Sequence, residues 1–176
     1  MQGCEKDRDI MTTPIILDRA ALGLNPRVVS FNRITSRPPL PRELGLIVVH
    51  YPGVKKLYRT EDLGKVARSI EAWKPGEYNY LIHPNGVVGS LAGEYVGAHC
   101  KGYNAVSYGV NILHGTQEQV SDEQVASFRW LIGCLAWAKA INLTPMIVQH
   151  GWLAPTACPG DVKRRWAEMT DGLRWA

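Results

Sequence analysis

Short apolar runs bounded by turn residues predict the strands of this chain. Residues 45–51 contain a continuous apolar run, as expected for a strand that is covered on both faces, and His50 stands near its end. Asn85 and Gly86 lie between two further β-type runs and predict a hairpin. The other expected strands are residues 78–83, 87–91, 107–113 and 146–149.

Apolar residues recur at helical spacing in the longer stretches between these runs. The expected helices are residues 61–73, 122–140 and about 161–169. Thr60 is the expected N-cap of the first helix, and Ser121 with Gln124 predicts a capping box for the second. Because strands and helices alternate around one hairpin, we expect an α/β protein, a single domain whose central mixed β-sheet is flanked by helices on both faces.

Prolines interrupt the beginning of the chain, so residues 1–43 are expected to form an extended N-terminal segment that packs on the domain. Residues 44–176 are the expected domain itself. With 176 residues, 45% of them hydrophobic and 20% charged, the chain is typical of one globular unit and not of a disordered or repeated sequence.

Two of the five histidines, His50 and His150, stand where an apolar strand ends and a turn with Gly or Pro begins. Cys158 follows His150 eight residues later. Pro155 and Pro159 stiffen the loop between them, so the thiol can fold back toward the imidazole. A single histidine is more often structural than catalytic, and the argument therefore depends on the three side chains together.

Two imidazoles and one thiolate form a donor set that suits Zn²⁺. Three protein ligands leave a fourth position for water, and the chain has no CxxC pair of the kind that closes a structural zinc site. Water on such an ion reaches a pKa of about 7 and can act as a nucleophile at neutral pH. The pattern therefore predicts an open, hydrolytic zinc site with no covalent nucleophile.

Four stretches of the chain carry a family resemblance: IVVHYPG, EYNYLIHPNGVV, VGAHCKGYNAVSYGVNI and HGWLAPTACPGD. Between about residues 45 and 165 they resemble, in order, the zinc-dependent N-acetylmuramoyl-L-alanine amidases, a family shared by phage lysozyme-type amidases and peptidoglycan recognition proteins. The resemblance implies hydrolysis of the amide between N-acetylmuramic acid and L-alanine in peptidoglycan. It implies one Zn²⁺ ion on His50, His150 and Cys158, with residues 44–176 as the catalytic domain.

The resemblance also implies catalytic roles for Tyr78 and Thr156. Tyr78 is expected beside the metal, where its hydroxyl orients the water or donates to the developing oxyanion, although strand propensity alone favours a packed core aromatic. Thr156 stands two residues before Cys158, where phage lysozyme-type members carry lysine and amidase-active recognition proteins carry threonine. Its hydroxyl can bond the tetrahedral intermediate but cannot supply the charge of the lysine.

Substrate contacts are implied for His99 and Asn104, which the resemblance places on a loop along the substrate groove. The alternative for His99 is a hydrogen bond that braces this loop, because polar loop residues serve either purpose. Nothing in the residues alone separates these two interpretations.

The net charge of +4 is spread along the chain and does not form a basic face of the nucleic-acid-binding kind. These charged side chains either belong to an ordinary solvated surface or attract the protein to an anionic polymer such as a cell wall. The resemblance implies peptidoglycan as the partner, and we further expect no nucleic acid, no membrane insertion and a monomer.

No apolar stretch approaches the roughly 20 residues of a membrane span, and the first residues lack the apolar core of a secretion signal. We expect a phage or prophage endolysin that stays in the host cytoplasm until holin-type release, or secretion by a route that the sequence does not reveal. The alternative is a peptidoglycan-binding module without activity. Non-cutting relatives usually lose a metal ligand, often the cysteine, so the complete ligand set favours the enzyme.

Overall fold

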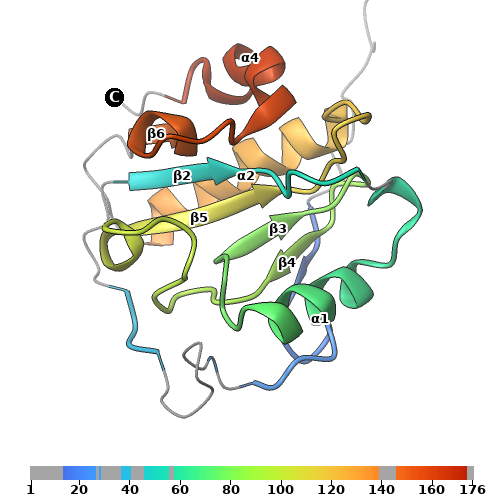
Figure 1. Cartoon of the computed structure of the whole chain (residues 1–176), viewed down its shortest axis with the longest axis vertical. Helices are drawn as coiled ribbons and strands as arrows, with labels where there is room; N and C mark the ends of the chain where they lie inside the picture. Colours follow the sequence, from blue (N-terminus) through green and yellow to red (C-terminus); the bar gives the residue numbers. More distant parts are fainter. Residues whose placement is uncertain are drawn as a thin grey trace, which may run out of the picture.

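The computed structural model describes residues 14–26, 28, 37–40, 46–55, 58–138 and 146–173. They form a six-stranded mixed sheet with helices on both faces (Figure 1), which confirms the predicted α/β class. The strands are β1 (Ile16–Leu17), β2 (Leu46–His50), β3 (Tyr80–Ile82), β4 (Val88–Ser90), β5 (Ser107–Ile112) and β6 (Met146–Gln149). The α-helices are α1 (Leu63–Trp73), α2 (Asp122–Ala138), α3 (His150–Leu153) and α4 (Trp166–Thr170), and 3₁₀ turns cover Tyr58–Thr60, Asn104–Val106 and Gly160–Arg165.

The strand order is β1-β4-β3-β5-β2-β6, and among these strands only β3 and β4 pair antiparallel. That pair is the predicted hairpin, and Gly86 has a φ of 83° in its turn, a conformation that glycine adopts without strain. Because β2 and β6 are parallel neighbours, their carboxyl ends lie side by side. His50, at the end of β2, and His150, which directly follows β6, are therefore brought to the same edge of the sheet.

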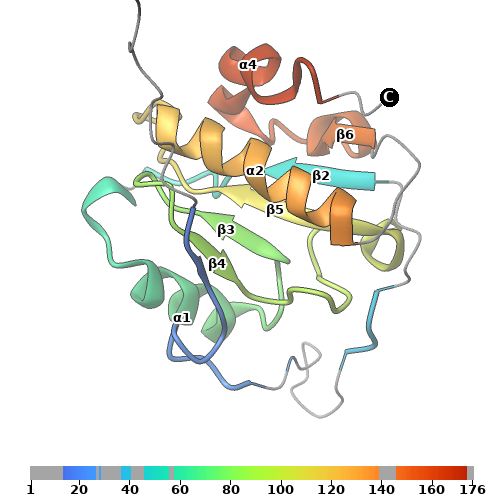
Figure 2. The same cartoon turned by 180° about the vertical axis from the view of Figure 1, so that it is seen from behind.

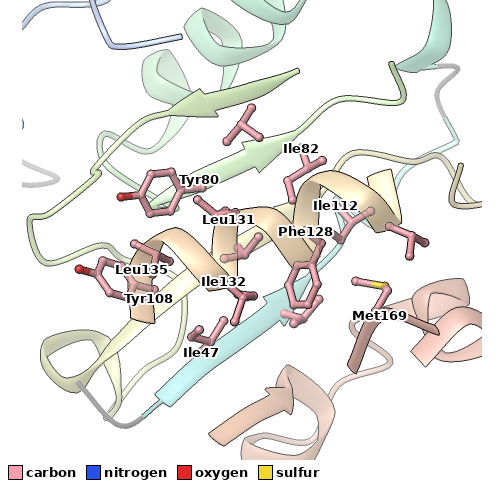
Figure 3. Close-up of a cluster of buried hydrophobic side chains, with 14 of the residues drawn as sticks. Ile47, Tyr80, Ile82, Tyr108, Ile112, Phe128, Leu131, Ile132, Leu135 and Met169 are labelled. Carbon is pink, nitrogen blue, oxygen red and sulfur yellow. The ribbon is translucent and has the colours of Figure 1, made fainter. Parts of the chain in front are cut away.

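The larger hydrophobic core lies between the sheet and α2, which crosses the sheet in Figure 2. Side chains of α2 pack there on the alternate residues of β2, β3 and β5 that point to this face. Figure 3 draws the cluster, which includes Ile47, Tyr80, Ile82, Tyr108, Ile112, Phe128, Leu131, Ile132, Leu135 and Met169. All ten side chains are buried, so this face of the sheet is closed to solvent.

The opposite face of the sheet is covered only in part by α1. A second cluster joins α1 to Leu81 of β3 and to Leu22 of the N-terminal segment. Val48 and Val148, on β2 and β6, form a third small cluster with Cys100. The carboxyl ends of β2, β5 and β6 on this face are occupied by polar side chains, and the candidate site lies there.

The capping residues differ in part from the sequence predictions. Asp62 and not Thr60 caps α1, because Thr60 lies in a 3₁₀ turn and the Asp62 carboxylate accepts from Lys65 N at 2.8 Å. The predicted capping box of α2 is confirmed: Gln124 N donates to Ser121 Oγ at 3.1 Å and Ser121 N donates to Gln124 Oε1 at 3.1 Å. Residues 139 and 140 of this predicted helix lie outside the described residues.

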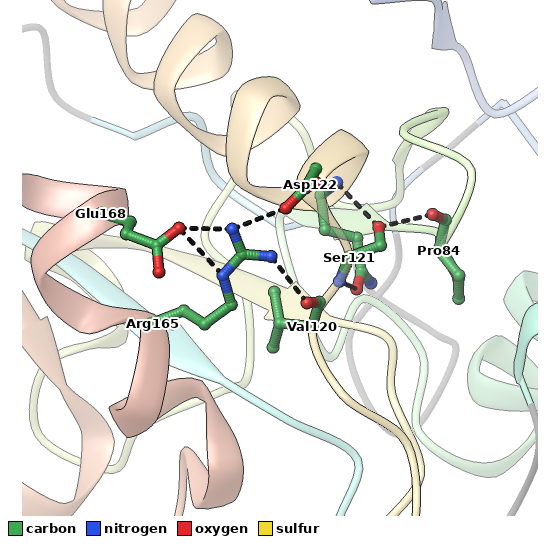
Figure 4. Close-up of polar contacts among 7 residues, drawn as sticks. Pro84, Val120, Ser121, Asp122, Arg165 and Glu168 are labelled. Atoms are coloured by element: carbon green, nitrogen blue, oxygen red, sulfur yellow. Dashed lines mark hydrogen bonds and ion pairs between the residues drawn. The ribbon is translucent and has the colours of Figure 1, made fainter.

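Arg165 ties the last part of the chain to the start of α2 (Figure 4). Its guanidinium donates to the carbonyl of Val120 at 3.0 Å, pairs with Asp122 at 2.7 Å and also contacts Glu168. The predicted helix over residues 161–169 is in fact a 3₁₀ turn followed by the short α4. This anchor holds the segment that follows Cys158 against the domain.

Part of the predicted irregular N-terminal segment is a strand, since β1 pairs parallel with β4. Two residues are too few for a hydrophobic period, which is why the sequence does not reveal them. Arg19 then enters the domain and donates to Leu91 O at 2.7 Å while it pairs with Glu71 at 2.6 Å. The predicted boundary between residues 43 and 44 lies outside the described residues.

Over the residues that the structure describes, no helix combines the length and the apolar character needed to cross a membrane.

Candidate metal centre

Three side chains converge at the carboxyl ends of β2 and β6. One nitrogen of His50, one nitrogen of His150 and Cys158 Sγ all lie within 4.8 Å of one another. The two imidazole rings are 4.5 Å apart between centroids, and Cys158 Sγ lies 3.7 Å from His50 Nδ1. The structure therefore brings together the three residues that the sequence suggested as metal ligands.

A close backbone contact folds the loop of Cys158 back onto His150. Gly151 N donates to Cys158 O at 2.8 Å, and a Cβ added at Gly151 would lie 2.8 Å from the same oxygen and 2.9 Å from Thr156 O. Real Cβ atoms are not found at such distances, so glycine is required here. The prolines were the sequence signal for this loop, whereas the need for Gly151 depends on a distance that the sequence does not reveal.

A chain of hydrogen bonds runs behind His50. His50 Nε2 lies 3.1 Å from His99 Nδ1, His99 Nε2 lies 3.4 Å from Ser107 Oγ, and Ser107 Oγ donates to Tyr103 O at 2.7 Å. Since the Ser107 proton goes to a carbonyl, Ser107 Oγ can accept from His99 Nε2 and His99 Nδ1 can accept from His50 Nε2. This assignment leaves His50 Nδ1 unprotonated on the side of Cys158.

Burial keeps these imidazoles neutral. It lowers the pKa of His50 well below its ordinary value, and the neighbouring His99 and His150 lower it further. Burial also lowers the pKa of His99 to about 4. Neutral imidazole is the form of histidine that binds metal, so His50 is ready to act as a ligand at neutral pH.

The Cys158 thiol, unlike the imidazoles, must become negatively charged to bind a metal. Burial raises its pKa to about 11, so without a nearby cation it would remain protonated at neutral pH. A divalent cation beside the sulfur would stabilise the thiolate directly. Two neutral imidazoles and one buried thiol therefore fit a soft or borderline metal ion and leave a coordination position open.

Tyr78 lies beside the three candidate ligands, with its ring centroid 5.3 Å from that of His50. Burial raises the pKa of Tyr78 above its ordinary value, and the nearby Glu77 carboxylate raises it further. The hydroxyl thus stays protonated over the physiological range and can donate one hydrogen bond.

The other predicted site residues shape the loops around the ligands. Thr156 is exposed, and its Oγ1 accepts from Cys158 N at 3.2 Å. Asn104 Oδ1 accepts from His99 N at 3.0 Å and from Cys100 N at 2.8 Å, so it braces the turn that carries His99. His99 itself is buried, with its ring between His50 and Ser107, which favours the bracing alternative over substrate contact.

Gly109 was not among the predicted site residues, yet the site depends on it. A Cβ added there would lie 2.2 Å from the His99 ring. The ring therefore rests directly on the backbone of β5. A glycine inside a strand is a known sign of close approach, and this was the available signal in the sequence.

Comparisons with known proteins indicate one family and one fold for this chain. A family model described as N-acetylmuramoyl-L-alanine amidase matches residues 41–161. The endolysin of Klebsiella phage KP32 is 30% identical over 140 residues, which cover 74% of this chain and 89% of that protein. Among solved structures, Drosophila PGRP-LB has a TM-score of 0.73 at 21% identity, covering 93% of this chain and 97% of that chain. The endolysin amidase LysCS from Clostridium intestinale URNW has a TM-score of 0.59 at 21% identity, covering 84% and 88%.

Proposed function

Because the chain belongs to the N-acetylmuramoyl-L-alanine amidase family, we propose that its activity uses one Zn²⁺ ion held by His50, His150 and Cys158. The enzyme hydrolyses the amide that joins N-acetylmuramic acid to L-alanine in peptidoglycan. Its similarity to phage endolysins over most of their length supports a role in lysis of the bacterial cell wall. The observation that carries the metal assignment is the approach of the three donor atoms to within 4.8 Å.

The ion and the chain have separate tasks in this proposal. When bound, zinc would polarise the scissile carbonyl and bring the pKa of a water molecule near neutrality. The water oxygen then adds to the carbonyl carbon, the C–N bond breaks, and a proton goes to the leaving amine. The chain must hold the ligands, keep them in the right protonation state and stabilise the oxyanion.

Tyr78 is the proposed oxyanion donor. Its raised pKa keeps the proton on the hydroxyl, and its ring lies next to His50. A neutral donor beside the developing negative charge stabilises the transition state more than the substrate. Thr156, in the loop of Cys158, is the proposed second polar group, whose hydroxyl would bond the tetrahedral intermediate.

His99 and Asn104 are proposed to act through other residues. In this proposal His99 Nδ1, 3.1 Å from His50 Nε2, accepts the proton of that nitrogen and so fixes the ring orientation and tautomer. Asn104 holds the turn that carries His99. Peptidoglycan would then approach the exposed side of the ligands, opposite to this buried support.

The test is metal-dependent cleavage of a defined muropeptide by the purified chain. We expect about one zinc per chain, release of the stem peptide with a free L-alanine amine, and loss of release after chelation with recovery on adding Zn²⁺. Mass spectrometry of the products identifies the bond that is cut. Full activity in a metal-free preparation would refute the zinc assignment, and binding to sacculi without turnover would select the alternative, a non-catalytic binding module.

A further inference from the structure

Asn111 of β5 carries a buried amide without a partner. Its side chain is 0% exposed, and neither Oδ1 nor Nδ2 makes a hydrogen bond to any other residue that the structure describes. More than about nine in ten buried polar groups in native proteins are hydrogen-bonded, and an exception points to a missing ligand or water. Among the described residues, the Tyr78 hydroxyl is the one side chain that interacts with this amide, and it can occupy the Nδ2 donor. The Oδ1 acceptor therefore still needs a donor that the described residues do not supply.

The sheet register places this amide in the candidate site. Asn111 lies opposite His50 of β2 and opposite Leu81 of β3, and both pairs are parallel. Residues opposite one another in neighbouring strands point to the same face. Asn111 thus belongs to the face that bears the candidate ligands. Its amide also lies close to the Tyr78 hydroxyl. Burial raises the pKa of Tyr78, and the interaction with Asn111 lowers it again in part.

Asn79 offers an internal comparison on the same sheet. It is also 0% exposed, but its Nδ2 donates to Gly93 O at 2.7 Å and to Tyr95 O at 2.8 Å, and its Oδ1 accepts from Gly109 N at 2.8 Å. Asn79 is therefore a structural asparagine with its hydrogen bonds formed within the chain. Asn111 has the same burial and none of these bonds.

We propose that Asn111 is a catalytic residue, whose Oδ1 accepts a hydrogen bond from the water molecule that hydrolysis consumes while its Nδ2 faces the oxygen of Tyr78. The inference rests on the proposed amidase function. The two contacts are chemically consistent with each other, because an amide offers one acceptor and two donors. A donor on the Tyr78 oxygen leaves the single Tyr78 proton free for the oxyanion.

A buried amide whose acceptor has no hydrogen bond lowers the stability of the protein when no reactant is bound. Replacing such an amide should therefore affect stability and activity in different directions. In Asn111→Leu, an apolar group of similar shape removes the unpaired amide. We expect the Tm of the metal-free protein to stay unchanged or rise, the zinc content to remain about one per chain, and kcat on a muropeptide to fall by roughly tenfold or more with little change in KM. Asn111→Ala, which cannot clash, should show the same loss of kcat.

The matched control is Asn79→Leu. It breaks three hydrogen bonds and should lower the Tm of the metal-free protein by roughly 5–10 °C. If Asn111→Leu and Asn111→Ala lower the Tm as Asn79→Leu does, Asn111 is structural and the inference is wrong. Wild-type kcat in either Asn111 variant also overturns it, whereas an inactive wild-type enzyme would overturn the proposed function instead.

Discussion

The two ring nitrogens of His50 have different partners, and this division depends on His99. Nδ1 faces Cys158 and Nε2 faces His99, so the ring can reach a metal through one nitrogen only. Support of this kind typically accounts for 10- to 100-fold in metal affinity. His99→Gln should therefore weaken zinc binding by about that factor, measured by competition with a chromogenic chelator.

The control for His99→Gln is His83→Gln. His83 is equally buried but bonds Asn85 and the carbonyl of Glu61, away from the candidate ligands. This variant can lose stability, but its zinc affinity should match that of the wild type. Equal zinc affinity in wild type and His99→Gln would contradict the orienting role.

Cys158 supplies the soft donor of the proposed zinc site. Cys158→Ser replaces a thiolate by a poor alcohol ligand, so zinc affinity should fall by roughly a hundredfold or more and activity should fall with it. Zinc content after dialysis and the rate of stem-peptide release measure the two effects. Cys134→Ser, on α2, should leave both at the wild-type level, and retention of zinc in Cys158→Ser would argue against thiolate ligation.

At the residue scale, the sequence identified the candidate ligands where a metal-binding residue type stands at the end of a predicted strand or in a loop with prolines. His50 and His150 were recognisable because each follows an apolar strand, and Cys158 because prolines enclose its loop. The contributions of Gly109 and Gly151 were not predictable, since each depends on a tertiary distance. Asn111 gave no signal either, because a lone polar residue in a strand does not reveal whether its amide is satisfied.

At the scale of elements, the loop of His99 packs closely on β5, with the His99 ring directly against Gly109. Gly109→Ala should lower the free energy of unfolding by about 1–3 kcal/mol, because its Cβ would overlap the ring. It should also weaken zinc binding by displacing His99. Denaturant unfolding and chelator competition measure the two effects.

A double-mutant cycle identifies the cause of that loss. Removal of the ring in His99→Ala should make the added methyl group of Gly109→Ala much less destabilising, so the two changes should not be additive. Additive effects would mean that the strand itself, and not the ring, rejects a side chain at position 109.

The types of the longer elements were predictable from the sequence, but the short elements and the ends were not. The hydrophobic periods of α1 and α2 and the Asn85–Gly86 turn gave the correct helices and hairpin. The cap of α1 was wrong because Thr60 and Asp62 are both good capping residues, and the 3₁₀ turn at Tyr58–Thr60 decides between them. The strand β1 is held by pairing with β4 and has too few residues to show a pattern.

For the whole molecule, Glu118 should give a pH-dependent contribution to stability. Burial alone would raise its pKa, but hydrogen bonds from the backbone amides of Gly115, Tyr58 and Arg59 lower it below the ordinary value of 4.5. The folded state therefore favours the carboxylate. The stabilisation is present above about pH 4.5 and is lost as the pH falls through the lower folded-state pKa.

Glu118→Gln should accordingly reduce the free energy of unfolding by about 1 kcal/mol at pH 7. The difference from wild type should shrink as the pH falls below about 4.5, where the wild-type carboxylate becomes protonated. Urea unfolding of both proteins across this range measures it. A difference that is independent of pH would show that the charge of Glu118 is not responsible.

The position of β6 at the edge of the sheet has a consequence for synthesis. This strand is the last one in the sequence order, and it brings His150 next to His50 of β2. A nascent chain on the ribosome that ends before His150 carries one of the three ligands and cannot assemble the site. Lytic capacity should therefore appear only after translation has passed Cys158 and this segment can pack against the earlier part of the chain.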